Sequence, residues 1–140
     1  MIRKIQKSDL EQVLNIWLEA SIISHDFIDS NYWVSKIKDM KYTYIPSSES
    51  YVYENKTGIC GFFSLSENIL AAIFVAPSQQ GKGIGMKLLQ TAKELRRELI
   101  INVYKENQKS IRFYEKAGFW FVKEQEDKNT GHLEIVMRWP

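Results

Sequence analysis

The chain has few of the residues that form disulfide bonds or bind metal ions in small domains. Its 140 residues include one cysteine, two histidines and three prolines. A single cysteine excludes an internal disulfide and fits a reducing compartment. Cys60 lies in the apolar run 58–63, so we interpret it as a packed core thiol and not as a nucleophile. We expect no bound metal ion.

The sequence also lacks a charge excess and a long hydrophobic run. Nineteen basic and seventeen acidic residues nearly cancel, so the bulk charge does not favour nucleic-acid binding. No apolar run is long enough to span a bilayer, and residues 1–9 contain no apolar signal core. We therefore expect a cytoplasmic protein that binds neither nucleic acid nor membrane. The length and the 44% hydrophobic content predict one domain over residues 1–140.

Hydrophobic periodicity and turn residues predict a chain of mixed α/β class. Ser8 and Glu11 have the spacing of a capping box at the start of the first helix, and Asp29 or Ser30 is expected to cap the second. His132 is out of step with the apolar positions of the last strand, so we expect it to face outward. The expected elements are a strand at Ile2–Gln6, a helix from Leu10, a helix from about Asn31 that ends at Pro46 and the Ser47-Ser48 pair, strands at Tyr51–Glu54, Ile59–Leu65 and Ile69–Val75, a helix from Gly83 to about Arg97, a strand at Leu99–Val103, a helix at Asn107–Ala117, and strands at Phe119–Glu124 and Leu133–Trp139.

A glycine-rich loop separates the apolar strand 69–75 from the following helix. Glycines at 81, 83 and 85 let the backbone approach a ligand, and the helix start offers unpaired amide hydrogens, which suits a phosphate or pyrophosphate. A tight turn without a ligand is the alternative. The loop is not a P-loop, because Met86-Lys87-Leu88 follows where Lys-Ser/Thr would be needed. It is not a dinucleotide fingerprint either, since the glycine spacing differs and 101–103 offers no acidic residue.

Two motifs resemble the GCN5-related N-acetyltransferase (GNAT) family. The loop Gln80-Gly81-Lys82-Gly83-Ile84-Gly85 fits the pattern Gln/Arg-x-x-Gly-x-Gly/Ala, with which that family binds acetyl-coenzyme A. The stretch Asn107–Phe119 is similar to the second signature, Asn-x-x-Ala-x-x-Phe-Tyr-x-x-x-Gly-Phe, with Ser110 in place of the alanine. The motifs occur in the family's order, and the order of elements fits the family over the full length, as in small bacterial single-domain members.

The resemblance implies a fold and a cofactor site. The fold is a mixed, twisted, mostly antiparallel sheet of about seven strands with about four helices. Its fourth and fifth strands, here Ile69–Val75 and Leu99–Val103, splay into a V that receives acetyl-coenzyme A. An amide of Val75 or Phe74 would polarise the thioester carbonyl, and the amides of 81–86 would hold the pyrophosphate. Lys82 or Lys87 would add charge near the 3′-phosphate.

The full set of expected acetyl-coenzyme A-binding residues is Ile73, Phe74, Val75, Gln80, Gly81, Lys82, Gly83, Ile84, Gly85, Met86, Asn107, Ser110 and Tyr114. Asn107 either hydrogen-bonds the pantetheine arm or caps its own helix, or does both through different atoms.

The resemblance also implies catalytic roles. Tyr114 is the candidate general acid, because a phenol can protonate the departing thiolate at neutral pH; a core tyrosine is the structural alternative. Relatives that acetylate proteins often carry glutamate where this chain has Asn102, and an amide cannot accept the proton. Asn102 is therefore assigned a positioning role, and His25 or Glu67 is the candidate base.

The function expected from these residues is transfer of acetyl from acetyl-coenzyme A to a primary amine by direct attack in a ternary complex. The acceptor would be a protein N-terminus or lysine, or a small amine such as a polyamine, amino acid or aminoglycoside, and the chain would be a monomer or homodimer. The loop from Ser21 to Ser30, the second helix and the last hairpin would line the cleft for the acceptor. A catalytically weak coenzyme A sensor is the main alternative. A nucleotide-binding domain of another type is the third.

Overall fold

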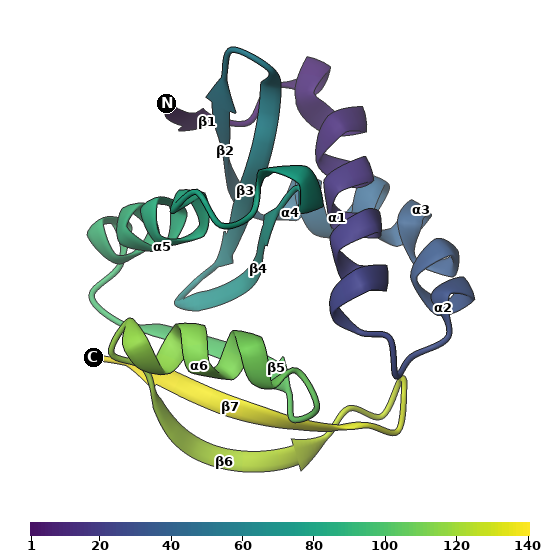
Figure 1. Cartoon of the computed structure of the whole chain (residues 1–140), viewed down its shortest axis with the longest axis vertical. Coiled ribbons are helices and arrows are strands. Elements are labelled where there is room, and N and C mark those ends of the chain that lie inside the picture. Colours follow the sequence, from purple (N-terminus) through teal and green to yellow (C-terminus); the bar gives the residue numbers. More distant parts are fainter.

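The computed structural model describes residues 1–140 and contains one seven-stranded sheet with helices on both faces (Figure 1). The strands are β1 (Ile2–Lys4), β2 (Glu49–Asn55), β3 (Gly58–Ser66), β4 (Ile69–Val75), β5 (Leu99–Tyr104), β6 (Trp120–Glu126) and β7 (Leu133–Trp139). The helices are α1 (Leu10–Ser24), α2 (Ser30–Ser35), α3 (Ile37–Asp39), α4 (Ile45–Ser47), α5 (Ile84–Leu95) and α6 (Gln108–Lys116), and short 3₁₀ or π turns lie at Lys7–Asp9, Met40–Tyr44 and Pro77–Gln79. No helix has the length and apolarity needed to cross a membrane.

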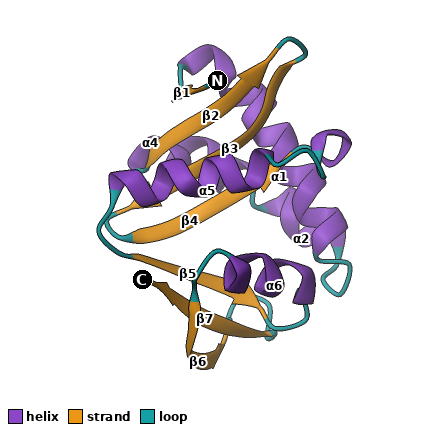
Figure 2. Ribbon diagram, turned by 60° about the vertical axis from the view of Figure 1, so that its left-hand side comes forward, coloured by secondary structure: helices purple, strands orange, loops and turns teal.

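The sheet confirms the predicted class and strand number. Its order is β1-β2-β3-β4-β5-β7-β6, and every neighbouring pair is antiparallel except β4 and β5. Two hydrophobic cores lie on opposite faces of the sheet. Helix α5 crosses one face and α1 lies on the other (Figure 2). One core packs beneath α5 and α6 and contains Leu88, Leu89 and Tyr114. The other packs beneath α1 and α2 and contains Val13, Trp17 and Trp33.

Strands β4 and β5 separate almost as soon as they meet. Their one registered pair is Ile69 with Ile100, and the Ile100 amide donates to the Asn68 carbonyl at 2.9 Å. Beyond this point the strands diverge (Figure 2), while β5 stays paired with β7 along all six of its residues. The predicted V between the fourth and fifth strands is therefore confirmed, with its open end at Val75 and Tyr104.

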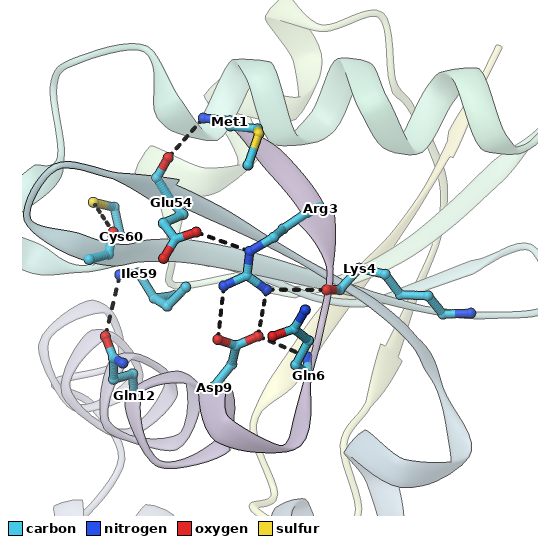
Figure 3. Close-up of polar contacts among 10 residues, drawn as sticks. Met1, Arg3, Lys4, Gln6, Asp9, Gln12, Glu54, Ile59 and Cys60 are labelled. Atoms are coloured by element: carbon cyan, nitrogen blue, oxygen red, sulfur yellow. Dashed lines mark hydrogen bonds and ion pairs between the residues drawn. The ribbon is translucent and has the colours of Figure 1, made fainter.

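The start of α1 differs from the predicted capping box. Ser8 is not the cap, because the preceding 3₁₀ turn is organised by Asp9, whose carboxylate accepts the Gln6 amide at 2.8 Å. Arg3 on β1 donates to both Asp9 oxygens, at 2.7 and 3.0 Å, and to Glu54 on β2 at 3.0 Å (Figure 3). The Arg3 guanidinium lowers the pKa of Asp9. This bidentate contact joins the edge of the sheet to the first helix, which local spacing could not reveal.

The second predicted helix is broken into shorter pieces. The predicted N-cap is confirmed at Asp29, whose carboxylate accepts a hydrogen bond from the backbone amide of Asn31 at 2.8 Å. The chain then passes through α3 and a π turn, in which the Ile45 amide donates to the Met40 carbonyl. Pro46 does not end the helical run. It lies in the first turn of α4, where its missing N–H is tolerated, and the run ends at Ser48.

The last strand is also less regular than its sequence suggested. Ile135 and Met137 are buried as predicted, but Leu133 is exposed. His132 does not simply face outward. Its ring packs against Phe27 with centroids 5.2 Å apart, and Nδ1 lies 2.8 Å from a carboxylate oxygen of Glu106. The reason is tertiary, because the α1–α2 loop folds over the start of β7.

Candidate functional site

A cavity of about 920 Å³ occupies the opening between β4 and β5. Both faces of the sheet contribute to its walls. On one face lie residues of the glycine loop and α6, such as Gly83, Ser110 and Tyr114. On the other lie residues of α1, α2 and the loop between them, such as His25 and Trp33. We call these the donor half and the acceptor half of the cavity.

The splayed strands leave backbone groups facing the cavity. The Ala76 amide donates to the Cys60 carbonyl on β3 at 2.7 Å. Because successive residues of a strand point their amides to opposite sides, Phe74 also faces β3, whereas Ile73 and Val75 face the gap. Of the two amides expected to polarise the thioester, that of Val75 faces the gap and that of Phe74 faces β3, which favours Val75. The Ile100 amide on β5 points toward β4, where it donates to Asn68. By the same alternation, the backbone amide of Asn102, two residues later, also points toward the gap.

The glycine loop lies at the open end of the V. Gln80 ties it to β4 by donating from Nε2 to the Val75 carbonyl at 3.1 Å. Gly81 and Gly83 have φ of +79° and +82°, and a Cβ at either position would meet no atom within 4 Å. Gly83 caps α5, whose first amides have no partner within the helix. The open space beside these amides is what an anionic diphosphate requires.

Tyr114 is buried in the core beneath α6, yet its side chain reaches the cavity wall. The hydroxyl makes no hydrogen bond within the chain, and it is not among the fully enclosed polar atoms without a partner, so it meets the cavity. Burial raises the pKa of the phenol. The group is therefore protonated at neutral pH and has a proton to donate.

Asn107 connects the two halves of the cavity. Its Oδ1 accepts the Ser110 amide at 3.3 Å and caps α6, which confirms one of the two predicted roles. Its Nδ2 lies 3.4 Å from Nε2 of His25. Because an amide NH₂ only donates, His25 accepts at Nε2 and carries its proton on Nδ1, which is buried without a partner. Burial lowers the pKa of His25, and the Ser21 backbone carbonyl offsets part of that shift.

Aromatic rings build most of the acceptor half. His25 stacks on Trp33 with centroids 5.0 Å apart and meets Tyr104 edge-on at 5.2 Å. Tyr104 donates its hydroxyl to Asp127 in the β6–β7 loop, and burial, followed by this hydrogen bond, raises its pKa. The ring cluster fixes the α1–α2 loop against the end of β5.

The predicted site residues are brought together with four exceptions, because Glu67, Lys82, Met86 and Lys87 do not line the cavity. Glu67 is exposed in the β3–β4 turn at φ 54°, at the closed end of the V, and does not line the cavity. Lys82 is exposed and contacts Gln79 at 3.2 Å, also outside the cavity lining. The Met86 side chain lies on a separate shallow groove beside Lys87, so only its backbone faces the loop.

Trp33, Tyr104 and Glu134 line the cavity. The second helix and the last hairpin, which hold Trp33 and Glu134, were expected to line the acceptor cleft, but none of the three residues was named as a site residue. The signal available for Glu134 was the alternation of side chains along the last strand, which places Glu134 and Ile135 on opposite faces of the sheet. Its pairing with Tyr104 on β5 depends on strand order, which a local pattern does not specify.

Comparisons with known proteins agree with this geometry. The Acetyltransferase (GNAT) domain family matches residues 46–120. The chain is 36% identical to the peptidyl-lysine N-acetyltransferase YiaC of Escherichia coli, over 100% of this chain and 97% of that protein. The solution structure of apo YjaB from Escherichia coli superposes with a TM-score of 0.86 at 25% identity, covering 99% of this chain and 96% of that one.

A third similar structure is the PaiA N-acetyltransferase of Thermoplasma acidophilum in complex with coenzyme A. It has a TM-score of 0.82 and 20% identity, and the match covers 99% of this chain and 96% of that one. It supports the fold. Together with the splayed strands and the glycine loop, these matches show that the chain belongs to the GNAT family and is an N-acetyltransferase with acetyl-coenzyme A as its co-substrate.

Proposed function

We propose that the chain acetylates lysine side chains of proteins in the cytoplasm, by direct attack of the amine on acetyl-coenzyme A in a ternary complex. The observation that carries this proposal is the cavity between β4 and β5, which has one wall on each face of the sheet. Donor and acceptor can thus approach the same point from opposite sides. The names of YiaC and YjaB, both peptidyl-lysine N-acetyltransferases, support the acceptor class.

The donor half fits the co-substrate group by group. The loop and first turn of α5 receive the diphosphate on backbone amides, in the open space at Gly81 and Gly83. The gap-facing backbones of Ile73 and Val75 pair with the amides of the pantetheine arm as an added strand would. The Val75 amide then lies where it can stabilise negative charge on the thioester oxygen.

Tyr114 serves as general acid in this proposal. Attack by the amine breaks the carbon–sulfur bond, and the sulfur leaves as a thiolate unless it is protonated. The raised pKa of the Tyr114 phenol keeps its proton in place until that moment. The hydroxyl is free of other partners, so the transfer breaks no existing hydrogen bond within the chain.

His25 is the better placed of the two candidate bases. It lines the cavity, whereas Glu67 does not. Its lowered pKa keeps the imidazole neutral at neutral pH, as a proton acceptor must be. The accepting atom is Nε2, so Asn107 gives up its 3.4 Å contact with that nitrogen when the proton arrives. Asn102 lies on the acceptor side of β5 and positions the amine or a water molecule.

The test is acetyl transfer by the purified chain to lysine-containing peptides and a panel of small amines, measured as free coenzyme A and as acetylated product. Tyr114→Phe should lower kcat by about 100-fold or more while acetyl-coenzyme A affinity changes little. Tyr42→Phe is the matched control, because that residue is 69% exposed and does not line the cavity. Binding of acetyl-coenzyme A without transfer to any amine would instead indicate a sensor.

A further inference from the structure

The charged residues of the cavity are divided between its halves. The donor half contains one basic side chain, Lys109, in the first turn of α6. The acceptor half contains three acidic side chains, Asp26, Glu106 and Glu134, and no lysine or arginine. This half therefore attracts a cation, which matches the charge of an alkylamine at neutral pH.

Of the three acids, Glu134 is the one that a strand of the sheet holds in place. Glu106 is next to His132, 2.8 Å away, and Asp26 is an exposed loop residue. Glu134 is half-buried near the start of β7, and it takes part in none of the chain's ion pairs. Its Oε1 accepts a hydrogen bond from the neutral Gln125 amide at 2.7 Å. The second oxygen has no partner within the chain.

Strand register directs Glu134 toward the acceptor. Glu134 lies opposite Tyr104, so both side chains are on the face of the sheet beneath the α1–α2 loop. Asn102 lies on the same face, opposite Val136. It is thus the diagonal neighbour of Glu134, at a typical separation of about 7–8 Å. A carboxylate and an amide oxygen at this spacing can both accept from one ammonium group between them.

We propose that Glu134 is the acceptor-binding carboxylate, which draws the ammonium of the incoming amine into the cavity and holds it beside Asn102 until it loses its proton. This role rests on the proposed acetyl transfer and specifies its acceptor as a cationic alkylamine. Gln125 orients the carboxylate through its hydrogen bond to Oε1, which leaves the second oxygen for the incoming ammonium. The residue binds and positions the amine, and it is not assigned the role of base.

The experiment compares Glu134→Gln with the wild type, using a lysine-containing peptide and n-butylamine as acceptors. The amide keeps the size of the side chain and removes the charge. We expect KM to rise about tenfold or more for both acceptors, with a smaller change in kcat and an unchanged acetyl-coenzyme A affinity. Glu134→Asp, which restores the charge on a shorter side chain, should recover part of the lost affinity.

Glu126→Gln is the matched control, because Glu126 is an exposed acid on the same hairpin and does not line the cavity. An unchanged KM in Glu134→Gln would overturn this inference alone. An equal loss of acceptor and acetyl-coenzyme A affinity would also overturn it, since that result indicates a general structural role. If the wild type transfers acetyl to no amine, the proposed function fails as well, and the two failures are thereby distinguished.

Discussion

At the scale of single residues, burial decides the protonation of His25. The ring is almost completely buried among Trp33, Tyr104 and Phe27, and no carboxylate contacts it to favour the charged form. Burial lowers its pKa, and the Ser21 carbonyl only partly opposes this. The unfolded chain keeps the ordinary value of about 6.5. Just below that pH, His25 is therefore protonated in the unfolded state but remains neutral in the folded state.

The consequence is a loss of stability on mild acidification. As pH falls through about 6.5 toward the folded pKa of His25, proton uptake by the unfolded chain lowers the free energy of unfolding, and the loss ends once the pH is below that folded pKa. His25→Gln removes this titration, so its unfolding free energy should decline less over the same interval. Urea unfolding at several pH values measures both slopes. Parallel slopes in the two proteins would contradict the assignment.

Individual site residues could be predicted where a sequence motif specified both the residue type and its position in the fold. Gly83 and Asn107 belong to such motifs, and the structure puts them where the resemblance implied, at the starts of α5 and α6. Tyr104 and Glu134 belong to no motif. Their place in the cavity comes from the pairing of β5 with β7, which joins segments about thirty residues apart in sequence.

At the scale of elements, we propose that the loop before α5 binds the diphosphate through its backbone amides, with little contribution from its side chains. Gly83→Asp introduces a side chain at a positive φ and places a negative charge in the open space beside the first amides of α5. We expect acetyl-coenzyme A to bind at least about tenfold more weakly. The new carboxylate repels the diphosphate and offsets the partial positive charge of the helix N-terminus that would otherwise attract it. Calorimetric titration measures the affinity.

Gly131→Asp is the matched control for this substitution. Gly131 has φ of +77° and equally open space around its Cα, but it lies in the β6–β7 turn. Both substitutions carry the same backbone strain and the same charge, so only a specific anion site separates them. Equal losses of affinity in the two variants would refute the loop assignment.

Helix limits were harder to predict than strand limits. The stretch after Ser35 keeps a helical period, yet the structure divides it into α3, a π turn and α4. A π turn ahead of Pro46 shifts the hydrogen-bond pattern by one residue, so proline enters a new first turn without breaking the run. Apolar spacing does not reveal such a shift, because it reports which face is buried and not how each amide is paired.

At the scale of the whole molecule, the fork in the sheet divides the chain into two halves. Strands β1–β4 with α1 form one half, and β5–β7 with α6 form the other. The sheet joins them at one pair, Ile69 with Ile100. The resemblance predicted this fork because it implied a complete fold, whereas the periodicity of the two strands alone is that of ordinary neighbours in a parallel sheet.

Acetyl-coenzyme A should close this fork with its own hydrogen bonds, and hydrogen exchange can observe the closure amide by amide. In the free protein the gap-facing amides of Ile73 and Val75 should exchange faster than the Phe74 amide, which faces β3. Saturation with acetyl-coenzyme A should slow Ile73 and Val75 and raise the melting temperature, because a ligand at about 100 times its Kd adds about 2.7 kcal/mol to the folded state.

The Gly83→Asp variant supplies the control for that measurement. At a concentration that saturates the wild type, this variant should retain fast exchange at Ile73 and Val75, because the diphosphate no longer secures the arm in the gap. Exchange that slows equally at all three amides would indicate general stiffening of β4. Exchange that slows at none of them in the saturated wild type would mean that the arm does not bind between the strands.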